Sequence, residues 1–421
     1  MLRKIIAIIL VNVFILNYGF SFSQEILLLE PLVKEARENN PDILAARKRW
    51  EAAKARIPQA KSFEDPSIGF TFEKIPGSPF QLNKTMSEDR MFSINQAIPA
   101  FGKLSLKGKI ALVESQMFAG EYRNKELQII NEVKQAYYDL FMNYKKTELN
   151  QVSLVFLKEI IEIAEVSYTV GETRQEDLFK INLEITQLRN DISNLKEEKA
   201  AIEIKLNLLL NRKADVAMGI PELKEGFSAI LDLDSLYRYT FENQPELLIF
   251  SYAIEKNKYA KSLAKRSFLP DIMTGIVMRG ITTGTIGPWD LMLAFSVPLW
   301  FWTKQRYEVK EAIANLEEAQ GAYLAMKNRA MAEVKDLATK VKIAQNKINL
   351  YKNIQIPLIE SSIEVSRASY LSNKGDIMML LDSERMLVET KINYYSALVA
   401  CYMNFADLER TVGVNLSEVK G

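Results

Sequence analysis

The chain has 421 residues with 54 basic and 53 acidic side chains, so its charge is close to neutral and no nucleic-acid partner is expected. Histidine is absent and Cys401 is the single cysteine, which removes the commonest general base and excludes an intrachain disulfide. The sequence has no phosphate-binding glycine loop and no nucleophile elbow. We therefore expect neither an enzyme, nor a cofactor, nor a resident metal site.

Residues 1–23 have the pattern of a secretory signal peptide. The basic residues Arg3 and Lys4 precede an unbroken apolar run at 5–16, and a small-x-small triplet follows at 21–23. A single-span membrane anchor is the alternative, but the apolar run is shorter than the ~20 residues that a spanning helix needs. We expect an exported protein.

The mature chain, residues 24–421, repeats one pattern twice. Asn-Asn-Pro-Asp-Ile-Leu at 39–44 is matched by Asn-Gln-Pro-Glu-Leu-Leu at 243–248, and further proline and tyrosine landmarks follow in the same order. A chance match is the alternative, but it does not explain the conserved order. We predict a single unit made of two structural repeats, about 31–213 and 232–413, with a linker at about 214–231.

Strand-like segments with alternating polarity precede the longest helical pattern of each repeat. From Trp289 to Val297 every second residue is large and apolar, while the residues between are smaller or polar. The first repeat shows the same alternation at 67–73 and 92–98. This pattern is typical of membrane barrel strands, and a soluble sheet with one buried face is the alternative. Because four strands cannot close a barrel, a membrane location requires several chains to share one.

Each repeat is also predicted to contain a very long helix. In the second repeat a largely apolar residue recurs every seven residues from Val309 to Tyr351, and Pro357 is the only proline between 303 and 369. The first repeat has similar spacing within 102–170. A seven-residue period predicts a left-handed coiled coil, and at 1.5 Å per residue such a helix is roughly 100 Å long.

Two return helices are expected to pack against the long ones. They span about 175–210 and 376–412, and the turns before them contain Gly171 and Gly375, a residue type that suits a helix end. Two antiparallel helical hairpins result.

These features together resemble the TolC family of outer-membrane efflux proteins over nearly the whole mature chain. The resemblance rests on the matched segments at 39–44 and 243–248 and on Gln-Ala-Ile-Pro-Ala-Phe-Gly-Lys at 96–103. Tyr-Tyr-Asp-Leu at 137–140 and Ser-Tyr-Thr-Val-Gly at 167–171 extend it. It implies a mainly α fold in which long coiled-coil hairpins form an α-barrel and a homotrimer shares a 12-stranded β-barrel.

The resemblance further implies a passive exit duct in the outer membrane, with the helices in the periplasm. Its partners would be outer-membrane lipid, a periplasmic adaptor and an inner-membrane pump, with the resistance-nodulation-division type favoured. The residues at 63–66 and 98–103 are more similar to the heavy-metal and cation branch of this family than to its drug-exporting branch. A type I protein secretion duct is one alternative, and a periplasmic coiled-coil adaptor or scaffold is another.

In this family, rings of aspartates on inward helices close the periplasmic tip. The matching segment here is Met-Met-Leu-Leu-Asp-Ser at 378–383, in which Asp382 takes the second acidic position and Met379 occupies the first. Three copies of Asp382 around an axis would repel one another or bind cations, whereas a solvated residue near a helix start is the alternative. The neighbouring tip candidates are Asp376, Glu384 and Arg385.

Three methionines near the tip raise a second question, because thioethers are ligands for soft metal ions. They are Met378, Met379 and Met386. Methionine is also a common filler on packed helices, and that interpretation is favoured.

Overall fold

The computed structural model describes residues 26–75, 82, 85–86, 89–171, 173–224, 232–280, 287–372 and 375–416. The predicted signal peptide lies outside these residues. The chain forms two compact units: the first is built from 1–40, 129–230 and 338–407, and the second from 41–128, 231–337 and 408–421. Each unit thus takes segments from both sequence repeats.

The second unit contains a four-stranded antiparallel sheet. Its strands are β2 (Ser67–Phe72), β3 (Arg90–Ile98), β5 (Asp271–Arg279) and β6 (Trp289–Ser296), in the spatial order β2-β3-β5-β6. Each repeat contributes two neighbouring strands, and the sheet joins the repeats where β3 pairs with β5.

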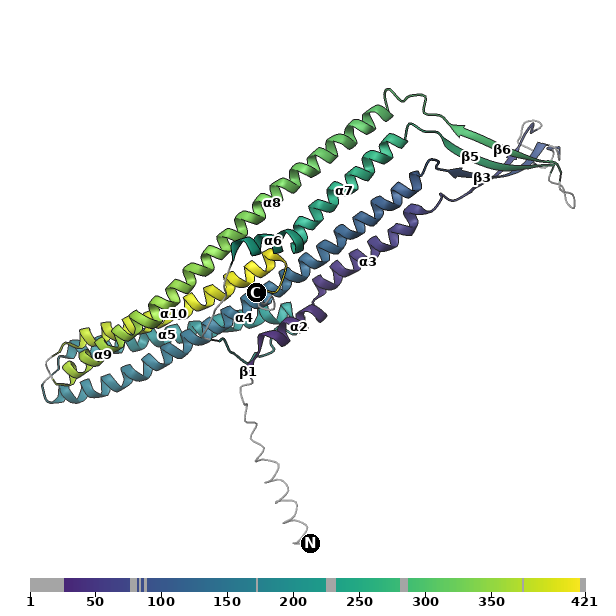
Figure 1. Cartoon of the computed structure of the whole chain (residues 1–421). Coiled ribbons are helices and arrows are strands. Elements are labelled where there is room, and N and C mark those ends of the chain that lie inside the picture. The colour runs from purple at the N-terminus through teal and green to yellow at the C-terminus, as the bar shows by residue number, and fades with distance from the viewer. Residues whose placement is uncertain are drawn as a thin grey trace, which may run out of the picture. The chain divides into compact units, whose positions relative to one another are not determined.

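Four helices of the second unit run toward the sheet, as Figure 1 shows. They are α3 (Pro41–Lys61), the beginning of α4 (Lys103–Thr169), α7 (Pro245–Arg266) and the beginning of α8 (Gln305–Leu350). The short helix α6 (Leu233–Asn243) precedes α7. Gly120 on α4 faces α7 closely, since a Cβ there would lie 2.6 Å from Ile249 Cγ1. A glycine at this position therefore allows the two helices to pack.

The first unit holds the remaining length of α4 and α8 together with α2 (Leu29–Asn39), α5 (Gln175–Leu209), α9 (Ile356–Leu371) and most of α10 (Ile377–Val412). The long helix α4 has 67 residues, which corresponds to about 100 Å. The predicted long helix and both return helices of the sequence analysis agree with these bounds to within one residue.

One strand of a small two-stranded sheet lies within the segment that was predicted to be a linker. Strand β4 (Ile220–Pro221) pairs in parallel with β1 (Ile26–Leu27). The buried Tyr137 of α4 lies beside this pair, because its hydroxyl is 2.7 Å from the carbonyl oxygen of Glu222 and accepts a bond of 2.9 Å from the Glu222 amide. Two-residue strands are too short to show a periodicity, so they could not be predicted from the sequence.

The predicted second long helix is interrupted once. Between α8 and α9 the residues Tyr351–Gln355 form a π-helical turn, η3. Pro357 lies two residues after this turn; in a regular α-helix its ring would clash with the carbonyl group four residues earlier, and it has no N–H to donate. A π turn accommodates both defects while the chain remains helical.

The heptad pattern on α8 predicted its buried face only in part. Ala330, Leu337 and Ala344 are buried as expected, but the early positions Leu316 and Tyr323 are half-buried. In that part of α8 the buried residues occupy a different heptad position, which also recurs every seven residues: Gln305, Ala312, Ala319 and Met326. A straight helix drifts by ~20° per heptad, so its buried stripe moves to an adjacent series along the length.

Among the described residues, no helix combines the length and apolarity needed to cross a membrane.

Candidate functional site

The four-stranded sheet has one apolar face that is exposed in the single chain. Directly paired residues of neighbouring strands lie on the same face, which aligns Phe70 with Phe92, Met278 and Trp289 across the sheet. Ile68, Phe70, Trp289 and Leu291 are 64 to 71% exposed. Such a continuous apolar surface is unusual on a water-facing protein and marks contact with lipid or another protein.

The opposite face of the same sheet is more polar. Arg279 donates a hydrogen bond of 2.7 Å to the Asp290 carboxylate, and Ser93, Asn95 and Thr71 share this face by register. The two faces therefore differ in polarity most clearly on β2 and β6, as in a membrane barrel with a polar interior, while β5 carries Met273 and Val277 on the more polar face.

Both edges of this sheet lack a neighbour in the described part of the chain, since β2 pairs only with β3 and β6 only with β5. Unpaired backbone groups are costly in hydrocarbon, so a membrane location requires each edge to be paired with another strand.

The junction between sheet and helices is held by buried charge. Lys103, the first residue of α4, is 8% exposed, and its Nζ donates to the Asp271 carboxylate at 2.9 Å and to the Leu269 carbonyl at 2.8 Å. The same carboxylate accepts the backbone N–H of Ala100 at 3.0 Å. This network ties the end of β3 to the start of β5.

A left-handed turn lies directly before Lys103. Phe101 and Gly102 have φ angles of +56° and +72°, and Arg266 of α7 donates a hydrogen bond of 2.6 Å to the Phe101 carbonyl. A Cβ on Gly102 would lie 2.5 Å from Arg266 Nη1. The motif at 96–103 thus encodes a turn with a required glycine and a buried lysine.

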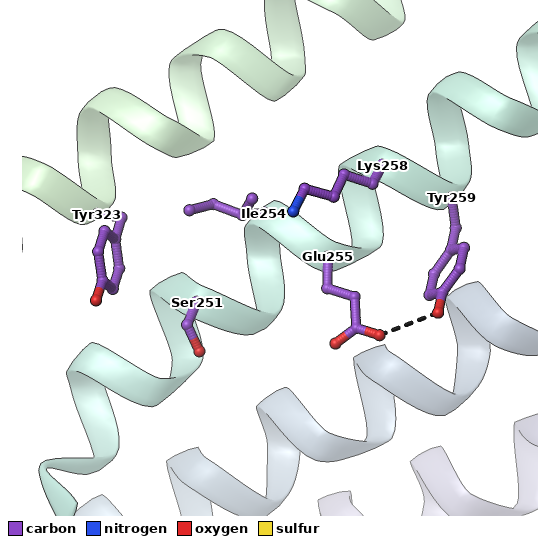
Figure 2. A pocket seen from close by; sticks show the side chains of 6 residues that line it. All are labelled: Ser251, Ile254, Glu255, Lys258, Tyr259 and Tyr323. Atoms are coloured by element: carbon purple, nitrogen blue, oxygen red, sulfur yellow. Dashed lines mark hydrogen bonds between the residues drawn. The ribbon is translucent and has the colours of Figure 1, made fainter. Parts of the chain in front are cut away.

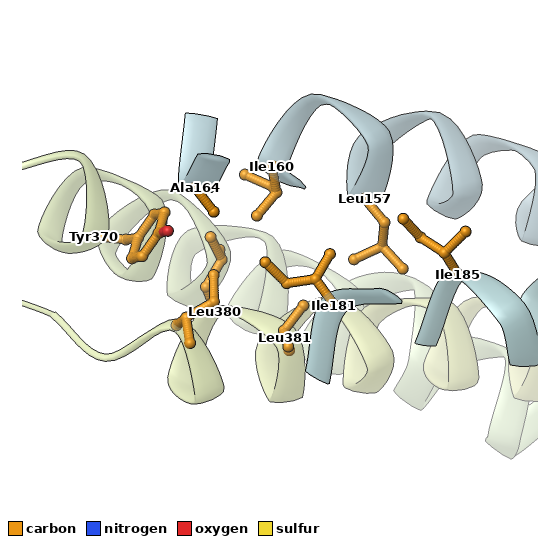
Figure 3. Packing of buried hydrophobic residues seen from close by; sticks show 9 residues of the cluster. Leu157, Ile160, Ala164, Ile181, Ile185, Tyr370, Leu380 and Leu381 are labelled. Carbon is orange, nitrogen blue, oxygen red and sulfur yellow. The ribbon is translucent and has the colours of Figure 1, made fainter. Parts of the chain in front are cut away.

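A hydrophobic cluster at the ends of the hairpins joins four helices of the first unit, as Figure 3 shows. It consists of Leu157, Ile160 and Ala164 on α4, Ile181 and Ile185 on α5, Tyr370 on α9, and Ile377, Leu380 and Leu381 on α10. Burial raises the pKa of Tyr370. This cluster fixes the start of α10, where the candidate gate residues lie.

Three of the predicted gate residues, Met379, Asp382 and Arg385, are exposed on α10. The Asp382 side chain is 61% exposed and Met379 is 62% exposed. Asp382 Oδ1 lies 3.5 Å from Arg385 Nη1. Arg385 also binds Glu184 of α5, with Nη2 at 2.8 Å from one carboxylate oxygen and Nε at 3.4 Å from the other. Glu184 was missed by sequence reasoning because it is distant in sequence and has no motif of its own.

The other two acidic candidates serve local structure in the single chain. Asp376 accepts the backbone N–H of Met378 at 3.1 Å and so begins α10. Glu384 is 8% exposed, and burial raises the pKa of its carboxyl group, while a hydrogen bond with Ser153 and the charge of Lys391 oppose that shift. Glu384 therefore faces α4 and not the solvent beside Asp382.

The three tip methionines do not share one environment. Met378 packs against the hydrophobic cluster, whereas Met379 and Met386 are 62% and 55% exposed. No group of three or more histidine, cysteine, aspartate or glutamate side chains suited to a metal ion occurs among the described residues.

A groove of about 520 Å³ lies between α7 and α8 in the second unit, and Figure 2 shows the side chains around it. It is lined by Ser251, Ile254, Glu255, Lys258, Tyr259 and Tyr323. The Tyr259 hydroxyl donates a hydrogen bond of 3.1 Å to Glu255, which raises the pKa of Tyr259. The Ser251 hydroxyl donates to the Leu248 carbonyl at 2.8 Å and not to a base, so the lining shows no activated nucleophile.

Comparison with known proteins agrees with this geometry. Residues 32–212 match the model of a family described as outer membrane efflux protein. No curated protein matches the sequence significantly.

Several solved structures share the fold. A membrane protein from Pseudomonas aeruginosa superposes with a TM-score of 0.80 at 16% identity, covering 93% of this chain and 92% of that one. The structure of CusC superposes with a TM-score of 0.78 at 17% sequence identity, and the superposition covers 92% of each chain. The outer membrane protein VceC from Vibrio cholerae superposes with a TM-score of 0.76 at 16% sequence identity, covering 92% of this chain and 96% of that one. The predicted fold class is confirmed.

Proposed function

We propose that this chain is an outer membrane efflux protein and that it forms one subunit of a homotrimeric passive exit duct; the support is the match of residues 32–212 to that family model and the fold shared with the solved structures. The matched family is described as outer membrane efflux protein, which supports an outer-membrane channel over an enzyme. The duct would receive solutes from an inner-membrane pump through a periplasmic adaptor.

One observation carries the trimer proposal: a sheet with a continuous apolar face has two unpaired edges. If β6 of one copy pairs with β2 of the next, three copies contribute 12 strands and leave no edge in the lipid. The polar face with Arg279 and Asp290 then lines the lumen.

The gate proposal rests on the start of α10. Asp382 and Met379 are exposed there, and Arg385, itself exposed, holds this segment to α5 through Glu184. In a trimer, three copies of Asp382 would narrow the tip and repel one another or bind a cation. Asp376 and Glu384 would support this arrangement by starting α10 and packing it on α4.

For partners and cargo we propose a pump of the resistance-nodulation-division type and heavy-metal cations. The support is the amino-acid sequence of the segments at 63–66 and 98–103, which resembles the cation branch of the family more than the drug branch. Export assays with this pump type and with a peptide-exporting ABC pump would distinguish efflux from type I protein secretion.

The first experiment is fractionation of expressing cells, followed by unheated electrophoresis of the detergent-extracted outer membrane. We expect a band at three times the chain mass that collapses on boiling. Single cysteines placed on β2 and β6, for example Ser67→Cys with Ser296→Cys and neighbouring registers, should crosslink between copies. Native Cys401 will not compete, because burial raises its pKa to about 12. A soluble periplasmic monomer would refute the duct.

The gate is tested by conductance of the purified trimer in a planar bilayer. We expect Asp382→Asn to raise the conductance and to weaken block by divalent cations, since three charges leave the constriction. The matched control variant is Asp191→Asn, because Asp191 is exposed on α5 away from the tip. Equal conductance and block in both variants would argue against a pore-lining Asp382.

A further inference from the structure

The turn that joins β6 to α8 exposes three consecutive aromatic residues. Trp300, Phe301 and Trp302 are 68%, 48% and 50% exposed. Their rings contact one another, with centroids 5.9 Å apart for Trp300 and Trp302 and 5.0 Å apart for Phe301 and Trp302. Phe268, which follows α7, lies 6.4 Å from Phe301. The result is a preformed aromatic surface and not three unrelated side chains.

This surface continues the apolar edge of the sheet. Leu291, Leu293 and Phe295 alternate along β6 and are 57 to 71% exposed. They are followed by the aromatic turn directly at the end of the strand, where a membrane strand leaves the hydrocarbon. Tryptophan is enriched at that depth because its ring is apolar and its N–H needs a polar partner.

The helix ends next to the sheet carry an excess of positive charge. The first eight residues of α4 contain Lys103, Lys107 and Lys109 and no acidic residue. Five basic residues and no acidic one occur in the last eleven residues of α7, namely Lys256, Lys258, Lys261, Lys265 and Arg266. Lys54, Arg56 and Lys61 at the end of α3 complete what we call the basic collar, together with Lys304, Arg306 and Lys310 at the start of α8, where Glu308 and Glu311 also occur.

Helix stability does not account for this collar at the starts of α4 and α8. Cations are unfavourable at a helix N-terminus because the helix dipole is positive there. Some members have protein partners, such as Lys103 with Asp271 and Lys256 with Glu114. Lys304 and Arg306, by contrast, are exposed and form no ion pair within the described part of the chain. Their charge is therefore available to a ligand.

We propose that the basic collar and the aromatic turn together bind anionic phospholipid headgroups in the leaflet on the helical side of the membrane. The tryptophans would lie at headgroup depth, with Lys304 and Arg306 just beyond them at the phosphates. This inference rests on the proposed membrane-embedded trimer and adds the class of lipid that it selects.

The proposed trimer brings positively charged helix ends of neighbouring copies together, because α8 follows β6 and α3 precedes β2. A second copy therefore does not neutralise this charge, and an anionic ligand does. An anionic leaflet supplies both an apolar layer and a negatively charged layer. Along the chain, the aromatic residues would meet the first layer and the basic residues the second.

The test uses native mass spectrometry of the full-length trimer released from membranes with equal phosphatidylglycerol and phosphatidylethanolamine. Wild type should retain phosphatidylglycerol preferentially. Lys304→Gln with Arg306→Gln should lower that retention roughly tenfold, since each basic residue near an anionic surface adds appreciably to binding. The control pair is Lys342→Gln with Lys347→Gln, which removes two exposed basic residues from the same helix away from the sheet.

A measurement on wild type alone provides a second check that needs no variant. Raising the salt from about 0.1 M to 1 M shortens the screening length to about 3 Å, so the preference for phosphatidylglycerol should largely disappear. Equal retention of both lipids by wild type, or equal loss in both variant pairs, would overturn the proposal. A trimer that forms in wild type but is lost in the Lys304/Arg306 variant would instead assign the surface to contact between copies. A wild-type monomer would reject the duct itself.

Discussion

Arg385 of α10 binds Glu184 of α5 through two nitrogens, with its Nη2 2.8 Å and its Nε 3.4 Å from the two carboxylate oxygens. The residues are 201 positions apart in sequence, one in each repeat. Because Glu184 is 20% exposed and Arg385 is 56% exposed, the pair is partly screened by solvent. It contributes on the order of 1 kcal/mol to holding the two helices together.

Breaking this pair should loosen the tip. We expect Glu184→Gln to raise trimer conductance several-fold, because about 1 kcal/mol corresponds to roughly a fivefold change in an open–closed equilibrium. Glu184→Arg with Arg385→Glu should restore the wild-type value. The control is Glu176→Gln, which breaks a bond to Lys180 within α5 alone. If the control and Glu184→Gln raise conductance equally, the clamp does not govern the gate.

The sheet–helix junction should be sensitive to the loss of one partner of its ion pair. Asp271→Ala leaves the Lys103 ammonium buried without its counter-charge, which costs up to about 3 kcal/mol when a buried charge is unpaired. Lys103→Met should cost less, because Asp271 is 39% exposed and can be hydrated. Thermal denaturation in detergent measures both variants. The reverse order of stability would contradict the described burial.

Two glycines should respond to alanine in opposite directions. Gly102→Ala places a Cβ against Arg266 at a φ of +72°, so we expect a loss of about 1–2 kcal/mol. Gly321→Ala lies on α8 with open space around it and should stabilise the helix by about 0.5–1 kcal/mol. Melting temperatures of the two variants, measured side by side, test the prediction. A gain in stability for Gly102→Ala would be inconsistent with the left-handed turn.

The buried carboxyl group of Glu384 should make stability depend on pH. Burial raises its pKa in the folded chain above the ordinary 4.5, so the folded state binds the proton more tightly than the unfolded state. The stabilisation from this group is thus complete below about pH 4.5 and is lost as the pH rises through the folded pKa. Glu384→Gln should remove this dependence and raise the melting temperature at neutral pH. Melting curves of both proteins between pH 4 and 8 should converge on the acidic side; parallel curves would show that Glu384 does not titrate in this window.

The sequence alone determined most of the fold. Apolar residues recur every three or four positions in α4 and every two positions in β6. Each of these periods predicts which face of the element is apolar, without knowledge of distant contacts. The recognisable motif at 96–103 also marked the strand–helix junction in the correct place. The signal peptide, the repeat boundaries and the gate assignments stay predictions.

Only the tertiary structure decided which residues meet across the repeats. Lys103 finds Asp271 at a separation of 168 positions, and Arg385 finds Glu184, although none of the four has a local pattern that names its partner. Exposure was likewise decided by packing: Glu384 and Asp382 are two residues apart on one helix, yet the first is buried against α4 and the second faces solvent. Periodicity fixes the direction of a side chain relative to its own helix, whereas the neighbour on that side depends on how the whole chain folds back.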